Sequence, residues 1–347
     1  MEKKMKIAIA GAGGIGGVVG GMLSKSGYDI TLVDQWHQHV EKIKKDGLIV
    51  QTRDGEYLSK PKAIHISELQ NEEIAFDVIF IAVKSYDTEW VSMMMKNYIE
   101  ENEGFFVNFQ NGVNDERMAN IVGATRSLGC IITIGAAAYE PGVAIRTDNN
   151  SPAFKIAEQD GSSTDRAKKL VEIMNSVGET ELTNDLWGER WSKLITNCMA
   201  NALAGLSGYG TAEVRTELYP RKIAIQLGAE VAKVAKALGH NIYSVGGVSP
   251  EALIDAADGK NVEDLENSLA ESGKKAGSLG YPSFAQDVKK GRRNEIDYLN
   301  GYVSMMGKKV GVATPFNDKI VEIIKGLGIK FTSDKNHLEP LVKMLNL

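Results

Sequence analysis

Residues 6–16 read KIAIAGAGGIG, a short apolar run that ends abruptly in a glycine-rich turn. The residues that follow, VVGGMLSKSG, are compatible with a helix, so the order is strand, turn, helix. In such a turn the first glycine permits a sharp bend, the second lets a pyrophosphate approach the backbone, and the last lets helix and strand pack closely. The stretch predicts a Rossmann-type dinucleotide-binding domain whose phosphate site at the helix N-terminus is formed by Gly11, Gly13, Gly14, Ile15 and Gly16.

The next apolar run, DITLVD at residues 29–34, predicts the second strand. It closes on Asp34, 18 residues after Gly16, where a carboxylate can accept hydrogen bonds from both hydroxyls of an adenosine ribose. The alternative is an aspartate that only caps the following helix. Gln35 comes next, with no arginine or lysine, and a carboxylate repels a 2′-phosphate. The sequence therefore favours NAD(H) over NADP(H) as the cofactor.

Two further apolar runs end in polar residues, FDVIFIAVKSYD (76–87) and GFFVNFQNGVND (104–115), as buried parallel strands do. Ligands collect at the C-terminal ends of the strands in such sheets. Lys84 and Asn111 stand at those ends, so both are candidates to bind cofactor and substrate. In the alternative interpretation, Lys84 begins a solvated helix and Asn111 belongs to an ordinary Asn-Gly turn.

Residues 127–158 predict short strands with a turn at Pro141-Gly142, which we expect to add to the sheet edge as antiparallel strands. A helix over 163–178 and a brief strand complete an N-terminal domain of residues 1–183. After Thr183 the β-branched runs almost vanish and helical periodicity takes over, so residues 184–347 predict an all-helical domain. Beyond the first helix, predicted to begin at Asn184 or Asp185 and to end at Gly205 or Gly208, helices are expected over 219–239, 249–257, 262–276, 283–290, 294–310 and 315–326.

The first helix of that domain carries WSKLITNCMAN at residues 191–201. Lys193, Asn197 and Asn201 recur every four residues and climb one stripe of the helix, drifting about 40° per step. The ordinary interpretation of such a stripe is a solvent-facing edge. Two residues far downstream, Ser283 and Glu295, flank a basic turn, and taken alone they are typical of a helix cap and of a first-turn acid favoured by the helix dipole.

Composition narrows the classes of function. The 347-residue chain is 43% hydrophobic, carries a net charge of -5, and has no apolar run long enough for a signal peptide or a membrane span. We therefore expect a cytoplasmic protein with no nucleic-acid or membrane partner. The two cysteines have no metal-ligand spacing, so no metal site is predicted, and none of the five histidines stands in a recognisable catalytic setting. Among the side chains that could donate a proton in catalysis, lysine is therefore the best candidate.

The chain resembles the ketopantoate reductase (2-dehydropantoate 2-reductase) family over nearly its whole length. The motifs that carry this resemblance are GAGGIGG (11–17), AVKSYDT (82–88), QNG (110–112), ERWSKLITNCMAN (189–201), SFAQDVKKGRRNEIDYLNG (283–301) and GVATPFN (311–317). The first is generic, whereas the order and spacing of all six are specific. The resemblance implies a Rossmann domain, a helical domain, and reduction of a 2-oxo acid, ketopantoate to pantoate, by a nicotinamide cofactor bound between the two domains.

The resemblance also implies roles for the polar residues. Lys193 matches the lysine that protonates the ketone oxygen, and Asn197 and Asn201 match substrate-binding asparagines. Glu295 matches the acid that holds the substrate hydroxyl and the lysine, and Ser283 matches the serine at the substrate carboxylate. Lys84 and Asn111 match residues that order cofactor and substrate, and a homodimer is a further expectation from the family.

Two alternatives stay open. Many family members carry an arginine after the second strand, where this chain has Asp34 and Gln35. The family also contains NAD-linked D-2-hydroxyacid dehydrogenases that act on branched or aromatic 2-oxo acids, and this activity is the first alternative. The remaining hypothesis is a protein that senses NADH without turnover. A complete set of lysine, asparagine, serine and glutamate argues against it, because binding alone needs no proton donor.

Overall fold

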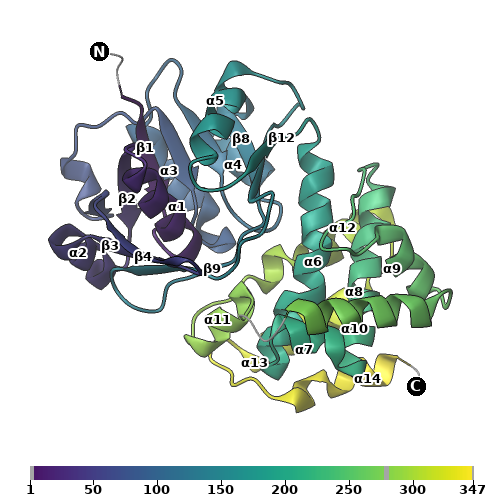
Figure 1. The fold of residues 1–347 in the computed structure, drawn as a ribbon. Helices are drawn as coiled ribbons and strands as arrows, with labels where there is room; N and C mark the ends of the chain where they lie inside the picture. The colour runs from purple at the N-terminus through teal and green to yellow at the C-terminus, as the bar shows by residue number, and fades with distance from the viewer. Residues whose placement is uncertain (1–3, 277–280, 346–347) are drawn as a thin grey trace. The chain divides into compact units, whose positions relative to one another are not determined.

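The computed structural model describes residues 4–276 and 281–345. Its contacts divide the chain into two compact units, Met1–Leu186 and Trp187–Leu347, coloured purple to teal and teal to yellow in Figure 1. The first unit is a mixed α/β unit and the second is helical. This architecture confirms the predicted fold class.

The first unit is built on an eight-stranded sheet with the order β12-β11-β8-β7-β6-β1-β2-β5. The six strands from β5 to β8 are parallel, and their order changes direction between β1 and β6. This is the doubly wound arrangement in which ligands bind at the strand C-termini. The strands are β1 (Lys6–Ala10), β2 (Asp29–Asp34), β5 (Lys62–His65), β6 (Val78–Ile81), β7 (Phe105–Asn108), β8 (Ser127–Ile132), β11 (Phe154–Glu158) and β12 (Thr180–Leu182).

Alternate residues of these strands enter two separate cores. Ile7 and Ile9 of β1 pack in one cluster with Val18 and Val19 of the first helix, while Ala8 and Ala10 pack in a second cluster on the opposite face. Both faces are buried because helices cover both, which explains the continuous apolar runs in the sequence. The helices of this unit are α1 (Gly14–Lys25), α2 (His37–Asp46), α3 (Thr88–Met95), α4 (Asp115–Val122) and α5 (Asp165–Met174), with one-turn 3-10 helices η1 (Leu69–Asn71), η2 (Ser85–Asp87), η3 (Lys96–Tyr98) and η4 (Ala124–Arg126).

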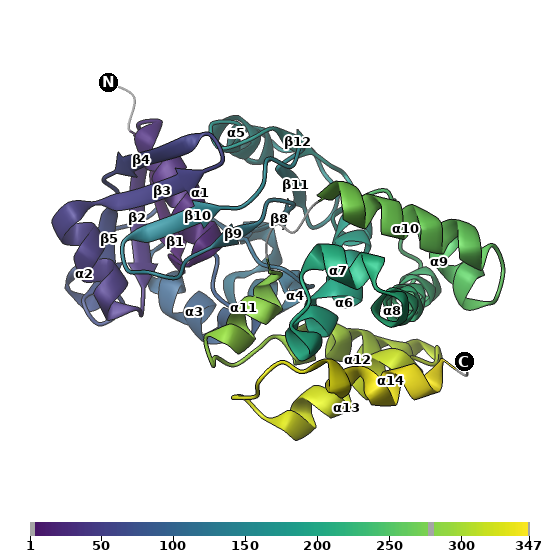
Figure 2. The same cartoon turned by 60° about the horizontal axis from the view of Figure 1, so that its bottom comes forward.

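The prediction for residues 127–158 was wrong in two respects. β8 pairs in parallel with β7 inside the main sheet, and only β11 adds to it as an antiparallel strand. Residues 136–146 leave this sheet and form β9 (Ala136–Ala137) and β10 (Val143–Arg146) of a second sheet, with order β4-β3-β10-β9, that lies beside α1 (Figure 2). Strand periodicity shows which residues alternate but not which partner strand they take, and the hairpin β3 (Leu48–Thr52) and β4 (Gly55–Ser59) supplies that partner.

The second unit consists of helices around the apolar α8, which is buried on most of its circumference. Most predicted helices lie within a few residues of their observed bounds. The short helices α7 and α14 were missed, and the predicted helix 294–310 is broken at Leu299, where the backbone leaves the helical region. The helices are α6 (Leu186–Ser207), α7 (Thr211–Thr216), α8 (Leu218–Ala237), α9 (Pro250–Ala257), α10 (Val262–Ala276), α11 (Ser283–Lys289), η5 (Ile296–Tyr298), α12 (Asn300–Val310), α13 (Pro315–Leu327), η6 (Lys335–Leu338) and α14 (Glu339–Met344).

A buried carboxylate joins α8 to α13. Glu230 accepts hydrogen bonds from the backbone N–H groups of Phe316 and Asn317 at 2.9 Å each, and from the Asn317 side-chain amide at 2.7 Å. Asn300 then donates to the Asn317 side-chain oxygen at 2.9 Å, which ties in the start of α12. No helix in residues 4–276 and 281–345 is both long enough and apolar enough to cross a membrane.

Candidate functional site

The glycine turn that opens the first unit is shaped by close backbone approaches. Gly11 has φ +106°, and a Cβ atom on it would lie 2.8 Å from the carbonyl carbon of Ala82. A Cβ on Gly16 would lie 1.9 Å from the Gly11 carbonyl oxygen, so the packing of α1 on β1 requires glycine there. By contrast, apart from its chain neighbours, no atom of the described residues lies within 4 Å of the Cβ position of Gly13. The space beside the N-terminus of α1, which begins Gly14-Ile15-Gly16, is therefore open to a ligand.

Asp34 lies beside this turn at the end of β2. One carboxylate oxygen accepts a hydrogen bond from the Ala12 N–H at 2.5 Å and the other accepts from the Trp36 N–H at 2.7 Å. Trp36 is the residue before α2, and α2 has no side-chain cap. Asp34 is thus fixed by the glycine turn rather than serving as the cap that the alternative interpretation expected.

A pocket with about 270 Å³ of empty space, counted out to solvent, opens at the ends of β1, β2 and β6. Asp34 is the one charged residue among those that line it. The wall opposite comes from α3 and includes Trp90, which is 40% exposed and donates from Nε1 to the Asp87 carboxylate at 2.8 Å. Sequence reasoning missed Trp90, since no motif marks it. The other lining residues are Ala10, Gly11, Val33, Gln35, Ile66, Val83, Val91 and Met94.

Lys84 and Asn111 follow β6 and β7, which are neighbours in the sheet. Buried polar side chains tie the two loops together. The Gln110 amide donates to the Val83 carbonyl at 2.6 Å, and the Asn114 amide donates to the Ser85 hydroxyl at 3.1 Å. The structure therefore brings the two predicted residues to one end of the sheet, the end where Gly11 and Asp34 also lie. Gln110 and Asn114 were not predicted as site residues from the sequence, although Gln110 belongs to the QNG motif.

In the second unit the polar stripe lies on α6, and its two asparagines are buried. Asn197 is 7% exposed and Asn201 is 6% exposed, whereas Lys193 is partly buried. Within residues 4–276 and 281–345, the Nδ2 of Asn197 has no hydrogen-bond partner. Leaving a buried amide donor unpaired costs stability, so such a group calls for an explanation. The interpretation of this stripe as a solvent-facing edge is wrong for both asparagines.

Ser283 and Glu295 lie on segments that pack against α6. Ser283 is the first residue of α11, after the N-cap Pro282, and is not itself the cap. The next residue, Phe284, packs on α6 so closely that a Cβ on Gly205 would lie 2.4 Å from its ring. Glu295 is 6% exposed and precedes η5. The amide of Asn300, just beyond η5, donates to the Cys198 carbonyl of α6 at 3.5 Å.

Solved structures with the same fold cover nearly the whole chain. A ternary structure of D-mandelate dehydrogenase with NADH and anilino(oxo)acetate is 25% identical, with a TM-score of 0.77, and covers 99% of this chain and 100% of its own. A PanE/ApbA family ketopantoate reductase from Ralstonia eutropha is 24% identical, with a TM-score of 0.75, and covers 92% of this chain and 97% of its own. The latter likeness concerns the fold alone.

Sequence relatives point the same way. A 2-dehydropantoate 2-reductase from Pyrococcus horikoshii is 27% identical over 323 residues, which are 92% of this chain and 97% of the relative. One from Lactococcus lactis is 29% identical over 324 residues, 92% of this chain and 97% of the relative. The family described as "Ketopantoate reductase PanE/ApbA" matches residues 7–160, and "Ketopantoate reductase PanE/ApbA C terminal" matches residues 185–328. Together these matches cover both units, and the chain belongs to the ketopantoate reductase family.

Proposed function

We propose that this protein is an NADH-dependent reductase of a 2-oxo acid, with 2-dehydropantoate as its first candidate substrate. The names of the curated relatives support the reaction. The observation that carries the proposal is the polar column on α6, where Lys193 stands one turn from a buried amide donor of Asn197 that has no partner among the described residues. A proton donor beside unsatisfied hydrogen-bonding groups suits a substrate with ketone and hydroxyl oxygens.

The first unit fits a nicotinamide dinucleotide. The open space at Gly13 faces the N-terminus of a 12-residue helix, which favours a pyrophosphate. Asp34 keeps unused lone pairs on both carboxylate oxygens, which can accept from two ribose hydroxyls. When bound, the reduced nicotinamide supplies a hydride to the keto carbon.

NADH is proposed over NADPH on electrostatic grounds. Asp34 is the single charged residue among the described residues that line the pocket at the end of β2, and a carboxylate there repels a 2′-phosphate. The D-mandelate dehydrogenase of similar fold was solved with NADH. Comparison of kcat/KM for NADH and NADPH tests the preference, and an NADPH preference contradicts it.

The second unit supplies the proton and holds the substrate in this proposal. Lys193 donates a proton to the ketone oxygen as that oxygen becomes alkoxide-like, and its positive charge stabilises the oxygen before transfer. Asn197 and Asn201 hydrogen-bond the rest of the substrate, Glu295 holds the substrate hydroxyl and orients Lys193, and Ser283 contributes a further hydroxyl. Lys84 and Asn111 order the cofactor and the substrate from the first unit.

A second candidate activity is that of a D-2-hydroxyacid dehydrogenase acting on a branched or aromatic 2-oxo acid. The D-mandelate dehydrogenase structure supports it, since the two chains match over almost their full lengths. The discriminating experiment is a turnover screen with NADH and NADPH against 2-dehydropantoate, 2-oxo-3-methylbutanoate and phenylglyoxylate. A kcat/KM at least tenfold higher for 2-dehydropantoate supports the first activity, and the reverse order supports the second. Absence of turnover on every 2-oxo acid contradicts both.

A further inference from the structure

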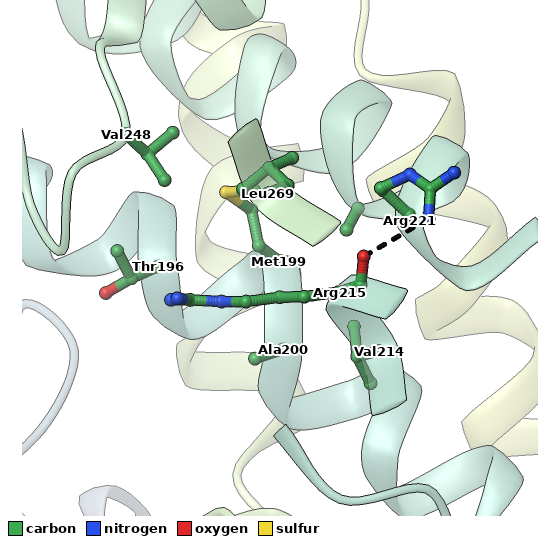
Figure 3. A pocket seen from close by; sticks show the side chains of 9 residues that line it. Thr196, Met199, Ala200, Val214, Arg215, Arg221, Val248 and Leu269 are labelled. Carbon is green, nitrogen blue, oxygen red and sulfur yellow. Dashed lines mark hydrogen bonds between the residues drawn. The ribbon is translucent and has the colours of Figure 1, made fainter. Parts of the chain in front are cut away.

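A second pocket lies within the helical unit and is lined by residues of α6, α7, α8 and α10. It has about 340 Å³ of empty space, counted out to solvent (Figure 3). Most of its wall is apolar, with Met199, Val248 and Leu269 among the lining side chains. None of the site residues predicted from the sequence is among the described residues that line it. The proposed reaction therefore gives this pocket no role.

Two arginines line the pocket, and they differ in their partners. Arg221 of α8 pairs with the Glu266 carboxylate at 3.2 Å and donates to the backbone carbonyl oxygens of Arg215 and Thr216. The Arg215 guanidinium donates to the Ser272 hydroxyl at 3.1 Å, and among the described residues no carboxylate pairs with it. Burial lowers the pKa of Arg215, yet arginine stays protonated in proteins. Arg215 is therefore a partly buried cation without an ion-pair partner in this part of the chain.

The position of Arg215 is fixed by the packing of α7. A Cβ atom on Gly273 would lie 2.9 Å from the Cβ of Arg215, so α10 meets α7 where α10 has no side chain. Arg221 holds the end of α7 through the two carbonyl oxygens to which it donates. Figure 3 shows the Arg215 side chain extended across the pocket, with its guanidinium toward Thr196 of α6. The guanidinium thus lies in the pocket before any ligand arrives.

The loop beside this guanidinium is a tight glycine turn. Gly246 and Gly247 have φ values of +61° and +77°, and Val245 and Val248 exchange backbone hydrogen bonds across them at 3.3 and 3.2 Å. Positive φ at both central residues is typical of a type I′ hairpin turn, which glycine adopts without strain. A Cβ atom on Gly246 would lie 3.6 Å from the Nη2 of Arg215. Because Gly246 has no side chain, the turn leaves space beside Nη2 for an oxygen atom of a ligand.

We propose that this pocket is a second ligand site, in which Arg215 binds the carboxylate of a small apolar monocarboxylate. A guanidinium binds a carboxylate with two parallel hydrogen bonds, and apolar surroundings strengthen the pair because they lower the local dielectric. One cation balances a single negative charge, whereas the second charge of a phosphate would stay unbalanced. Met199, Val248 and Leu269 then contact the aliphatic body of the acid, and the flexible Met199 side chain adapts to its shape. The inference is independent of the proposed reaction, because it requires no turnover.

The test measures binding without turnover. We would titrate 3-methylbutanoate, and its uncharged amide, into wild type, R215M, R215K and the double variant K193M/S283A by calorimetry. R215M should raise the Kd of the acid by about 10- to 100-fold, the range that a charge-assisted hydrogen-bonded pair contributes. R215K should keep part of the affinity, and the amide should bind wild type about as weakly as the acid binds R215M. K193M/S283A disables the proposed catalytic site and should bind the acid with the wild-type Kd.

Two further variants separate the pocket from general effects of substitution. Ala224 belongs to the apolar wall, so A224L fills the pocket while Arg215 stays in place. A224L should weaken binding of the acid, and it keeps the proposal testable if R215M fails to fold. Lys233 of α8 pairs with Asp258 and is not among the described lining residues. K233M also removes one positive charge and should leave the Kd of the acid unchanged.

Four results would overturn the proposal. Wild type does not bind the acid, or R215M and A224L bind it with a Kd within about threefold of wild type. Alternatively, K193M/S283A loses binding, which places the acid at the proposed catalytic site, or R215M loses more than about tenfold in kcat/KM for the 2-oxo acid, which places Arg215 there. Should wild type turn over no 2-oxo acid, the proposed function fails, whereas the calorimetric titrations still decide about Arg215.

Discussion

Replacing Asn197 by leucine should separate stability from activity. The side chain is 7% exposed, and its Nδ2 finds no hydrogen-bond partner in the described part of the chain, so it is an unsatisfied amide donor there. An unpaired buried polar group of this kind costs about 1–3 kcal/mol. Leucine has the same branch at Cγ but no donor. Its larger volume crowds the core, which offsets part of the stability that is gained. We expect N197L to raise the free energy of unfolding by about 1 kcal/mol.

For a unit of this size, 1 kcal/mol corresponds to a rise in Tm of about 2–4 °C. The same substitution should lower kcat/KM for the 2-oxo acid by about 10- to 100-fold, because a substrate oxygen loses its hydrogen-bond donor in a buried place. Calorimetric unfolding without ligand gives the first quantity, and steady-state kinetics at saturating NADH gives the second. A substrate analogue should stabilise wild type more than N197L.

Ser304 on α12 provides the matched control. It is 8% exposed, its hydroxyl also has no hydrogen-bond partner in the described ranges, and it has no role in the proposed site. S304A should keep or slightly raise Tm and leave the kinetics unchanged. If N197L has a lower Tm than wild type and an unchanged KM, the amide is a structural group and the reasoning fails.

Three further predictions concern the cofactor, the proton donor and a buried acid. D34A should raise the Kd for NADH by about 100-fold, because it removes the acceptor for two ribose hydroxyls. Fluorescence titration measures this Kd, and a value within threefold of wild type contradicts the assignment. K193M should lower kcat by about 10²–10⁴ while the Kd for NADH stays unchanged, and retained turnover at saturating cofactor rejects Lys193 as general acid. Burial raises the pKa of Glu230 above its ordinary value of 4.5, which outweighs the lowering by the N–H donors of Phe316 and Asn317. The folded state therefore binds more protons, so the stability contributed by Glu230 is complete below pH 4.5 and is lost as pH rises through the folded pKa. Urea unfolding should show the stability difference between wild type and E230Q falling as pH rises from 4.5, and a rising difference contradicts it.

The parts of the fold that were predictable are those with local physical signatures. The turn at Gly11 to Gly16 requires glycine for close backbone approach, and the strand that ends at Asp34 has its observed bounds because its apolar run ends there. The second sheet was not predictable in this way. β10 pairs with β3, about a hundred residues earlier in the chain, and nothing in the alternation of VAIR specifies that partner.

The candidate site was likewise predictable only in part. A four-residue repeat showed that Lys193, Asn197 and Asn201 share a face, but periodicity alone left that face solvent-exposed or buried. Only the packing of the chain decided that both asparagines are buried. Trp90 was missed for a related reason. It lies on a short helix with no motif around it, and its place in a pocket depends on residues from other elements.

Two charged residues of the helical unit that are removed from water differ in the partners they have. Glu230 receives three N–H donors from α13, which accounts for its burial as a structural joint between helices. Arg215 is likewise removed in part from water but receives no carboxylate within the described chain. A partly buried cation that has no carboxylate partner lowers the stability of the folded protein. Asn197 of α6 is another group that lacks a full set of partners, since its buried amide nitrogen has no hydrogen-bond partner among the described residues. Of the two, Asn197 is the one that shares the polar column with Lys193, so the proposed function gives its amide nitrogen a ligand, an oxygen of the 2-oxo acid.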